Sequence, residues 1–245
     1  MLSKRKKYKV LCIIPARGGS KGIKLKNLSK IGNKPLIYYP ITAAKKSGVC
    51  DDIFVSTDSS KIAKEAKKYG ASVPFLRNKK YSGSLTTTEK TLQNALLSYE
   101  QFHNTKIDIC VFLTCTNFFR KISWVKDVVN NLIKNKNLES SFVVSKLYRH
   151  FWHQINGSKP EKIAKWMNNY TSRQIAPKLY REETGLACAT RAKFWRKGKR
   201  IGKKVKFVIS DNSFTGFDIN NSQDLEILNL VFDYIKKKKI KKIIY

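Results

Sequence analysis

The sequence predicts an α/β fold in which a mostly parallel sheet is covered by helices on both faces. Short, continuously apolar segments alternate with segments of helical periodicity, and glycine or small polar residues separate them. Such apolar runs are typical of strands buried on both faces, and strand–helix alternation is typical of parallel sheets. With 245 residues, 42% of them hydrophobic, the chain can bury a large core. We therefore expect one domain over residues 1–245, with an embedded excursion over residues 146–185.

Each predicted element rests on a local pattern. Leu92, Ala95 and Tyr99 follow a helical spacing. Asp58 and the serines after it can cap a helix that stops at Gly70. The expected strands are residues 8–16, 52–57, 71–75, 107–113, 140–145 and 205–209, and the expected helices are residues 35–48, 60–70, 84–103, 125–132 and 222–235.

The loops that follow three of these strands carry the most unusual residues. In parallel sheets, ligands bind beyond the carboxyl ends of the strands. The loops after Ala16, Thr57 and Leu113 should therefore meet at one site.

The charge is the strongest compositional feature. Lys and Arg number 50 against 17 Asp and Glu, a formal net charge of +33. Nucleic-acid binding is one interpretation of such a charge. The lysines, however, are spread through nearly every segment, so we interpret them as solvated surface and do not expect nucleic acid as the partner. A basic surface would still concentrate phosphate-bearing and carboxylate-bearing substrates.

The sequence shows no secretion signal and no apolar run that approaches the roughly 20 residues of a membrane span, so we expect a cytoplasmic protein without membrane insertion. The five cysteines are odd in number and scattered, with no CxxC pair. We expect buried free thiols.

The loop after the first strand is a candidate phosphate site. Glycines at positions 18, 19 and 22 let backbone amides approach an anion, and Arg17, Lys21 and Lys26 can neutralise a polyphosphate. The loop is neither a Walker A motif nor a GxGxxG dinucleotide motif.

The stretch IPARGGSKGIKLKN, residues 14–27, resembles the signature of cytidylyltransferases that activate N-acylneuraminate and related nonulosonic acids, with a shorter form in the Kdo-activating relatives. Further similar segments follow in the same order along the chain. They are GNKPLI at residues 32–37, VSTDSSKIAKEAKKYGA at residues 55–71, LTCTNFFR at residues 113–120 and FDINNSQDL at residues 217–225.

The resemblance implies the Rossmann-like fold of nucleotide-diphospho-sugar transferases and a defined reaction. The anomeric hydroxyl of an acidic sugar would attack the α-phosphorus of CTP and release pyrophosphate, with Mg²⁺ as cofactor. By position in the motifs, Lys21, Arg17 and Asp218 would be catalytic. The nucleotide-binding residues would be Ala16, Arg17, Gly18, Gly19, Ser20, Lys21, Lys26, Asn27, Arg77 and Thr114.

The metal and sugar sites follow from the same resemblance. Asp218 would bind Mg²⁺ with Asn220, which stands where the family pattern has a second Asp. The segment TSRQIAPKLYREETG, residues 171–185, resembles the sugar-side stretch of the family, which also supports dimerisation, so we expect a homodimer. The residues expected to meet the sugar are Arg120, Lys146, Arg149, Arg173 and Gln174.

The sequence also departs from the family pattern, and two alternatives stay open. Asn78 replaces a Pro, Ser84 an Asp and Thr114 a Gln. These changes favour a related nucleotidyltransferase acting on Kdo, pseudaminate, legionaminate or an amino-sugar analogue. The charge and Asn220 raise a second alternative, a degenerate binding protein whose basic surface engages nucleic acid or lipid.

Overall fold

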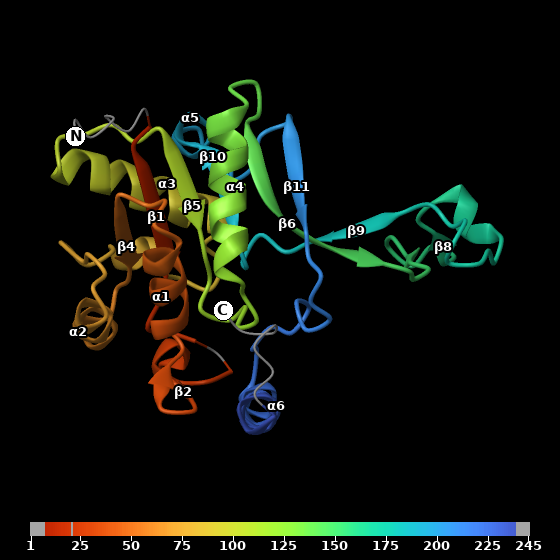
Figure 1. The fold of residues 1–245 in the computed structure, drawn as a ribbon, viewed down its shortest axis with the longest axis horizontal. Coiled ribbons are helices and arrows are strands. Elements are labelled where there is room, and N and C mark those ends of the chain that lie inside the picture. Colours follow the sequence, from red (N-terminus) through yellow and green to blue (C-terminus); the bar gives the residue numbers. More distant parts are fainter. Residues whose placement is uncertain (1–7, 21, 239–245) are drawn as a thin grey trace.

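A central sheet organises the computed structural model, which describes residues 8–20 and 22–238 (Figure 1). Within those residues the sheet has seven strands, in the order β11-β6-β10-β5-β1-β4, with β9 paired to β6. The strands are β1 (Val10–Pro15), β4 (Asp52–Ser56), β5 (Ile109–Phe112), β6 (Ser140–Leu147), β9 (Leu179–Glu182), β10 (Cys188–Arg191) and β11 (Val205–Ile209).

The part of the sheet formed by β4, β1 and β5 is parallel, as the sequence predicts. Strand β1 pairs in parallel with β4 and with β5, and β11 pairs in parallel with β6. Strand β10 runs antiparallel between β5 and β6 and joins the two parallel parts. The carboxyl ends of β1, β4 and β5 therefore lie at the same edge.

Helices cover both faces of the sheet, and the alternation of side chains along β1 divides the core in two. Val10, Cys12 and Ile14 belong to one buried cluster, which includes residues of α1, α2, α4 and α6. Leu11 and Ile13 belong to the other, which includes residues of α3 and α5. The helices are α1 (Tyr38–Ser47), α2 (Ser60–Lys68), α3 (Thr88–Phe102), α4 (Ile122–Lys134), α5 (Ala192–Arg196) and α6 (Ser222–Lys237).

Two local expectations differ from the structure. The segment expected to be a strand at residues 71–75 contributes only an isolated bridge between Phe54 and Ser72. Pro74 has no backbone N–H to continue the ladder. The helix expected from Ser84 begins at Thr88, where the side chain of Thr87 accepts the Lys90 N–H. The loop therefore gains four residues, 84–87, and two of them, Ser84 and Thr86, become part of the site.

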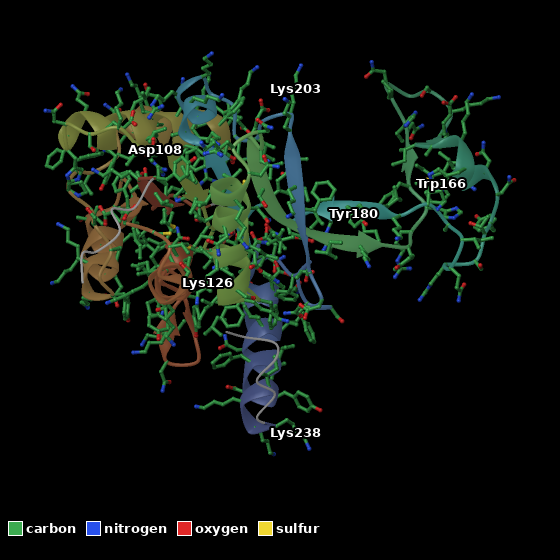
Figure 2. All side chains as sticks on the ribbon, turned by 45° about the horizontal axis from the view of Figure 1, so that its top comes forward. Asp108, Lys126, Trp166, Tyr180, Lys203 and Lys238 are labelled. Atoms are coloured by element: carbon green, nitrogen blue, oxygen red, sulfur yellow. The ribbon has the colours of Figure 1, made fainter. Side chains whose placement is uncertain are left out.

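A long arm leaves the body beyond β6 and returns through β9 (Figure 1). It carries the short strands β7 (Trp152–His153) and β8 (Glu161–Lys162) and the 3₁₀ helix η3 (Lys165–Asn168). Figure 2 shows its side chains, including Trp166, standing apart from the main core. Lys162 packs over the rings of Trp152 and Tyr170, which gives the arm tip a small cluster of its own.

None of the helices within residues 8–20 and 22–238 combines the length and the apolar character needed to cross a bilayer.

Candidate nucleotide and sugar site

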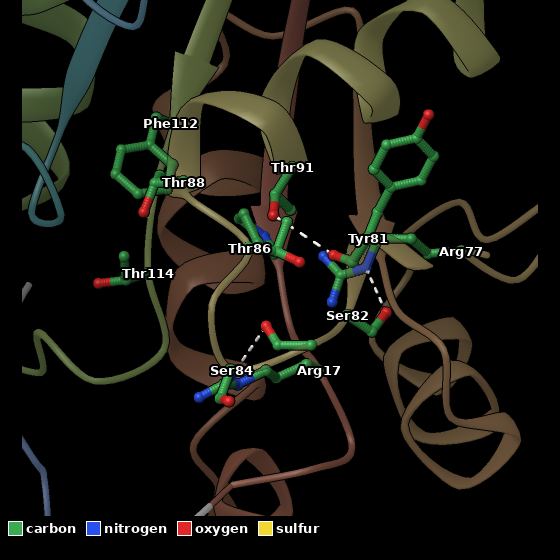
Figure 3. A pocket seen from close by; sticks show the side chains of 12 residues that line it. Arg17, Arg77, Tyr81, Ser82, Ser84, Thr86, Thr88, Thr91, Phe112 and Thr114 are labelled. Atoms are coloured by element: carbon green, nitrogen blue, oxygen red, sulfur yellow. Dashed lines mark hydrogen bonds between the residues drawn. The ribbon is translucent and has the colours of Figure 1, made fainter. Parts of the chain in front are cut away.

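A cavity of about 290 Å³ opens beyond the carboxyl ends of β1 and β5 (Figure 3). It brings Arg17, Arg77 and Thr114 together from three separate loops. Two of these are the loops after Ala16 and Leu113 that were predicted to meet, and the third follows residues 71–75. The segment between Arg77 and α3 forms another part of its wall. The lining residues are Pro15, Arg17, Arg77, Tyr81, Ser82, Gly83, Ser84, Thr86, Thr88, Thr91, Phe112 and Thr114.

The glycine-rich loop after β1 is held in place by its neighbours. The Ala16 N–H donates to the Ser56 carbonyl at 2.9 Å, and the Gly18 N–H donates to Oδ1 of Asp58 at 2.8 Å. Asn27 is buried, and its Nδ2 donates to the Arg17 carbonyl at 3.0 Å. Asn27, expected to meet the nucleotide, thus braces the loop that carries Arg17.

The loop also approaches the chain near the carboxyl end of the domain. A Cβ on Gly22 would lie 2.3 Å from the Asn220 carbonyl oxygen, a backbone atom that cannot easily yield. Lys26 donates through Nζ to the Ile219 carbonyl at 2.7 Å. Burial lowers the pKa of Lys26 below its ordinary value, and the nearby Asp218 carboxylate acts in the opposite direction. The predicted phosphate and metal residues therefore share one neighbourhood.

Arg77 is the most deeply buried cation of the cavity, with 6% of its surface exposed. Its Nε donates to Oγ of Ser82 at 3.0 Å, but its Nη1 is buried and has no hydrogen-bond partner. Burial lowers its pKa, while Asp58 acts to raise it. Because a buried charged donor without an acceptor is costly, Nη1 is suited to an acceptor that a ligand brings.

Thr114 lies at the end of β5 in a tight polar network. Its hydroxyl lies 2.6 Å from Oδ1 of Asn117 and 3.2 Å from the Gly185 carbonyl. Asn117 also bridges Asp218 through an isolated antiparallel pairing. This network links the cavity to the segment before α6 that carries the predicted metal ligand.

Arg120 adjoins this network and does not have the environment expected of a sugar contact. It is 2% exposed, and its guanidinium donates to the backbone carbonyls of Thr114, Gly185 and Leu186. A guanidinium engaged in this way holds two loops together, so Arg120 is placed to position the site and not to meet a substrate carboxylate.

The residues predicted to bind a metal offer a minimal oxygen set. Asp218 and Asn220 are both exposed, and the Asn220 side-chain amide donates to the Asp218 carbonyl at 3.4 Å. Within the described part of the chain no three His, Cys, Asp or Glu side chains gather into a metal cage. Mg²⁺ is commonly held by one or two protein oxygens together with phosphates and water. One carboxylate and one amide oxygen fit that mode of binding.

A second cavity, of about 640 Å³, lies beside the arm at the ends of β6 and β11. Lys146 and Arg149, two of the predicted sugar contacts, line it with Arg181. The Arg181 guanidinium pairs with the buried carboxylate of Glu183 at 2.6 Å. A Cβ on Gly216 would lie 2.0 Å from Arg181, so only glycine lets the guanidinium occupy this position.

The remaining predicted residues lie in different places. Ser20 is half-buried and Gly19 is exposed in the loop, whereas Lys21 lies outside the described residues. Arg173 and Gln174 are both exposed on the arm and line neither of these cavities. Within one chain the structure does not bring them to the nucleotide loop.

Several residues at the site escaped the sequence reasoning. Asp58 was expected, with the serines after it, to cap a helix, but Ser59 is the cap and the Asp58 carboxylate accepts from the Gly18 amide. The polar run after Arg77 gave a usable signal, because seven of the eight residues from Tyr81 to Thr88 are Tyr, Ser, Thr or Gly. Arg181 and Glu183, which pair with each other, gave no signal, because their place at the second cavity depends on the pairing of β9 with β6.

Comparisons with known proteins agree with this geometry. The family described as "Cytidylyltransferase" matches residues 11–240. The chain is 29% identical over 231 residues to post-translational flagellin modification protein B of Campylobacter coli, covering 94% of this chain and 97% of that protein. It is 30% identical over 222 residues to the CMP-N,N'-diacetyllegionaminic acid synthase of Campylobacter jejuni, covering 91% and 94% of the two chains.

The fold also resembles solved structures. CMP:2-keto-3-deoxy-manno-octonic acid synthetase in complex with CTP superposes with a TM-score of 0.67 at 14% identity, over 92% of this chain and 99% of that chain. At this identity the likeness shows a common fold.

Proposed function

The chain belongs to the cytidylyltransferase family, and from this we propose that it transfers CMP from CTP to an acidic nine-carbon sugar of the nonulosonic type, with release of pyrophosphate. The observation that carries the proposal is the cavity that places Arg17 of the glycine-rich loop beside the buried Arg77 and Thr114. Arg17 provides a cation for phosphate at the glycine-rich loop, and the buried Nη1 of Arg77 provides a hydrogen-bond donor that has no partner.

The nucleotide base fits the Arg77 side of the cavity. Cytosine presents acceptors at its O2 and N3 atoms, and the Arg77 Nη1 is a donor in need of an acceptor. The loop from Ser82 to Thr86 adds hydroxyls and backbone groups around the base. The triphosphate would then extend toward Arg17, Lys26 and the amides of the glycine-rich loop. Lys21, which lies outside the described residues, is proposed from its position in the motif alone as the phosphate contact nearest the chemistry.

The reaction is a single displacement at phosphorus. A lone pair of the anomeric hydroxyl oxygen forms the bond to the α-phosphorus, and the bond from that phosphorus to the bridging oxygen of pyrophosphate breaks. The hydroxyl proton leaves to solvent. Lys26 and Arg17 are placed to stabilise the negative charge that grows on the phosphoryl oxygens and the leaving group.

We assign Mg²⁺ as the cofactor, held by Asp218 and Asn220 together with the phosphates of CTP. The ion would neutralise the leaving pyrophosphate. Asp218 directly precedes Ile219, and the Ile219 carbonyl accepts a hydrogen bond from the Lys26 ammonium. The metal ion and Lys26 would therefore act on the same phosphates. We propose a cytoplasmic location, because CTP is supplied there.

The sugar carboxylate requires cations beyond the nucleotide loop. Lys146 and Arg149 lie at the base of the arm, and Arg173 and Gln174 lie farther along it. We propose a homodimer in which the arm of one protomer supplies Arg173 and Gln174 to the site of its partner. The arm exposes large apolar side chains that such an interface would bury. They are Tyr148, Trp152, Ile155, Ile163, Tyr170 and Ile175.

Activation of Kdo is the second candidate, and the structural likeness to a Kdo synthetase favours it as a related option. The two candidates differ in the sugar and share the cavity, the metal residues and the chemistry.

The experiment that tests the proposal is pyrophosphate release from CTP and Mg²⁺ over a panel of nonulosonic acids and Kdo. We expect release with a nonulosonic acid and its loss in Lys21→Ala and Asp218→Ala. Faster turnover of Kdo would move the assignment to the second candidate. No pyrophosphate release with any sugar, together with salt-sensitive DNA binding and no CTP-dependent rise in Tm, would support a non-catalytic basic protein instead.

A further inference from the structure

One guanidinium between two carboxylates lies beside the end of the cavity opposite Arg77. The Nη2 of Arg200 donates to Oε1 of Glu182 at 3.0 Å, and its Nε lies 3.6 Å from Oε1 of Glu89. Glu89 is in the first turn of α3, Glu182 ends β9, and Arg200 lies between α5 and β11. Three segments far apart in the sequence therefore meet in what we call the Arg200 cluster.

The cluster adjoins residues that line the cavity. The Arg200 guanidinium carbon lies 6.0 Å from the centre of the Phe112 ring, and Glu89 directly follows Thr88. Figure 3 shows Phe112 and Thr88 at one end of the cavity, with Arg77 and Ser82 at the other. Thr114 lies on the Phe112 side as well. With the base proposed at the Arg77 end, the sugar would extend toward the Phe112 end.

The hydrogen bonds of the cluster are incomplete. The Arg200 Nε is buried and has no hydrogen-bond partner, because its 3.6 Å separation from Glu89 is too long for one. The side chains of Glu89 and Glu182 keep 39% and 43% of their surface exposed. The cluster thus offers carboxylate acceptors and an adjacent unsatisfied donor.

The charge balance at this place is unusual for the chain. Asp and Glu number only 17 against 50 Lys and Arg, yet two of the 17 face a single guanidinium here. The backbone of Arg200 is fixed as well, since its carbonyl accepts the Thr190 hydroxyl at 2.8 Å and the Trp195 indole N–H at 3.0 Å. The backbone of Arg200 is therefore anchored, and its guanidinium holds two acceptors next to Phe112, which lines the end of the cavity.

We propose that the Arg200 cluster determines sugar specificity by recognising a nitrogen-bearing substituent, an acylamino or amino group, on the acidic sugar. The N–H of such a group donates to the Glu89 or Glu182 carboxylate, and the carbonyl of an acyl group accepts from the Arg200 side. A hydroxyl in its place makes fewer of these contacts. This inference rests on the proposed function and adds the substrate feature that the site selects.

A salt bridge that only stabilises the fold would behave differently. Partly exposed ion pairs contribute little to stability, and their loss should affect CTP and sugar alike. A specificity role instead changes the KM for the sugar and leaves the KM for CTP unchanged.

The test compares N,N'-diacetyllegionaminic acid with the nonulosonic acid that carries hydroxyls in place of its acetamido groups. Pyrophosphate release gives kcat/KM for both sugars with the wild-type chain, Glu182→Gln, Glu89→Gln and Arg200→Lys. Glu226→Gln, on the exposed face of α6, is the matched control. The Tm of each variant reports folding.

We expect the wild-type chain to prefer the acetamido sugar, and the preference to fall about tenfold in Glu182→Gln or Glu89→Gln, with KM for CTP unchanged. Glu226→Gln should keep the wild-type preference. The specificity role is overturned if Glu182→Gln and Glu89→Gln both keep the wild-type preference, or if they change the KM for CTP and the KM for the sugar equally. In either case the proposed function stands. No turnover of any nonulosonic acid by the wild-type chain overturns both.

Discussion

The Arg17 guanidinium donates through Nη1 to the Gly83 carbonyl at 3.2 Å and so joins the loop after β1 to the loop before α3. The first loop is expected to hold the phosphates and the second the base. A triphosphate competes with the Gly83 carbonyl for the same donors, because a charged acceptor makes the stronger hydrogen bond. Arg17 therefore couples phosphate binding to the position of the wall that surrounds the base.

Arg17→Ala should raise the KM for CTP at least tenfold with little loss of stability, because Arg17 is only half-buried and its one hydrogen bond here joins two loops. Steady-state kinetics and a thermal melt check this. Lys61→Ala, which removes an exposed cation from α2, is the control for net charge. Equal effects of the two variants on the KM for CTP would mean that Arg17 acts only through the net positive charge of the protein.

Arg77→Lys should keep the buried charge and remove the Nη1 donor. We expect weaker CTP binding, seen as a smaller CTP-dependent rise in Tm, and poorer discrimination between CTP and UTP. Arg77→Met should also lower the Tm of the free protein, because Ser82 and Asp58 lose their partner. If Arg77→Lys discriminates the two nucleotides as the wild-type chain does, the base lies elsewhere.

A pH prediction follows from Glu100, whose side chain is 4% exposed and lies 2.5 Å from the Arg196 guanidinium. Burial acts to raise the pKa of Glu100, but hydrogen bonds from Arg196 and the Ile107 amide outweigh it, and the pKa is lowered. A depressed carboxyl pKa gives stability that is present above the unfolded value of about 4.3 and is lost as the pH falls through the folded value.

Glu100→Gln should therefore lower the free energy of unfolding by about 2 kcal/mol at pH 7. The difference from the wild-type chain should shrink below about pH 4. Denaturant titrations at a series of pH values measure it. Glu65→Gln breaks the pair with Lys68 on α2, whose cation is 58% exposed, and should change little at any pH. A pH-independent difference at Glu100 would contradict the ion-pair origin.

The sequence predicted the parts of the fold whose signals are local. Apolar runs located β1, β4 and β5, and the Asn221 capping box begins α6 at Ser222, as expected. Strand β10 was missed because Cys188-Ala189-Thr190-Arg191 is small and polar, and only its position between β5 and β6 buries it. Four residues of this composition leave no periodicity to detect.

For the site, too, the sequence predicted what depends on local signals and missed what depends on tertiary contacts. Arg17, Arg77 and Thr114 were found because motifs carry them, and the cavity brings them together. Arg120 was predicted to meet the sugar, since a motif shows residue type but not which acceptors surround it. Its burial against three carbonyls is a tertiary property.

Gly185→Ala tests the network around Thr114. A Cβ there would lie 1.9 Å from Oδ1 of Asn117 and 2.8 Å from the Thr114 hydroxyl, so the network must shift. We expect a loss of about 1 to 3 kcal/mol in stability, typical of overpacking, and a lower kcat. Gly19→Ala, where a Cβ would meet nothing within 4 Å, is the stability control. Wild-type stability and kcat in Gly185→Ala would show that the network adapts without consequence.

Asn220→Asp places a second carboxylate where the family pattern has one, beside Asp218. If both side chains hold Mg²⁺, this variant should lower the Mg²⁺ concentration for half-maximal pyrophosphate release severalfold, because a carboxylate binds a hard cation more tightly than an amide does. Asp218→Asn should raise that concentration at least tenfold. Glu226→Gln serves as the control, since it removes an exposed carboxylate of α6 that is not a predicted ligand. Metal binding without turnover can be followed by Mg²⁺-dependent stabilisation of the CTP complex. An unchanged Mg²⁺ requirement in both variants would place the metal on other oxygens and leave Asp218 as a partner of Lys26 alone.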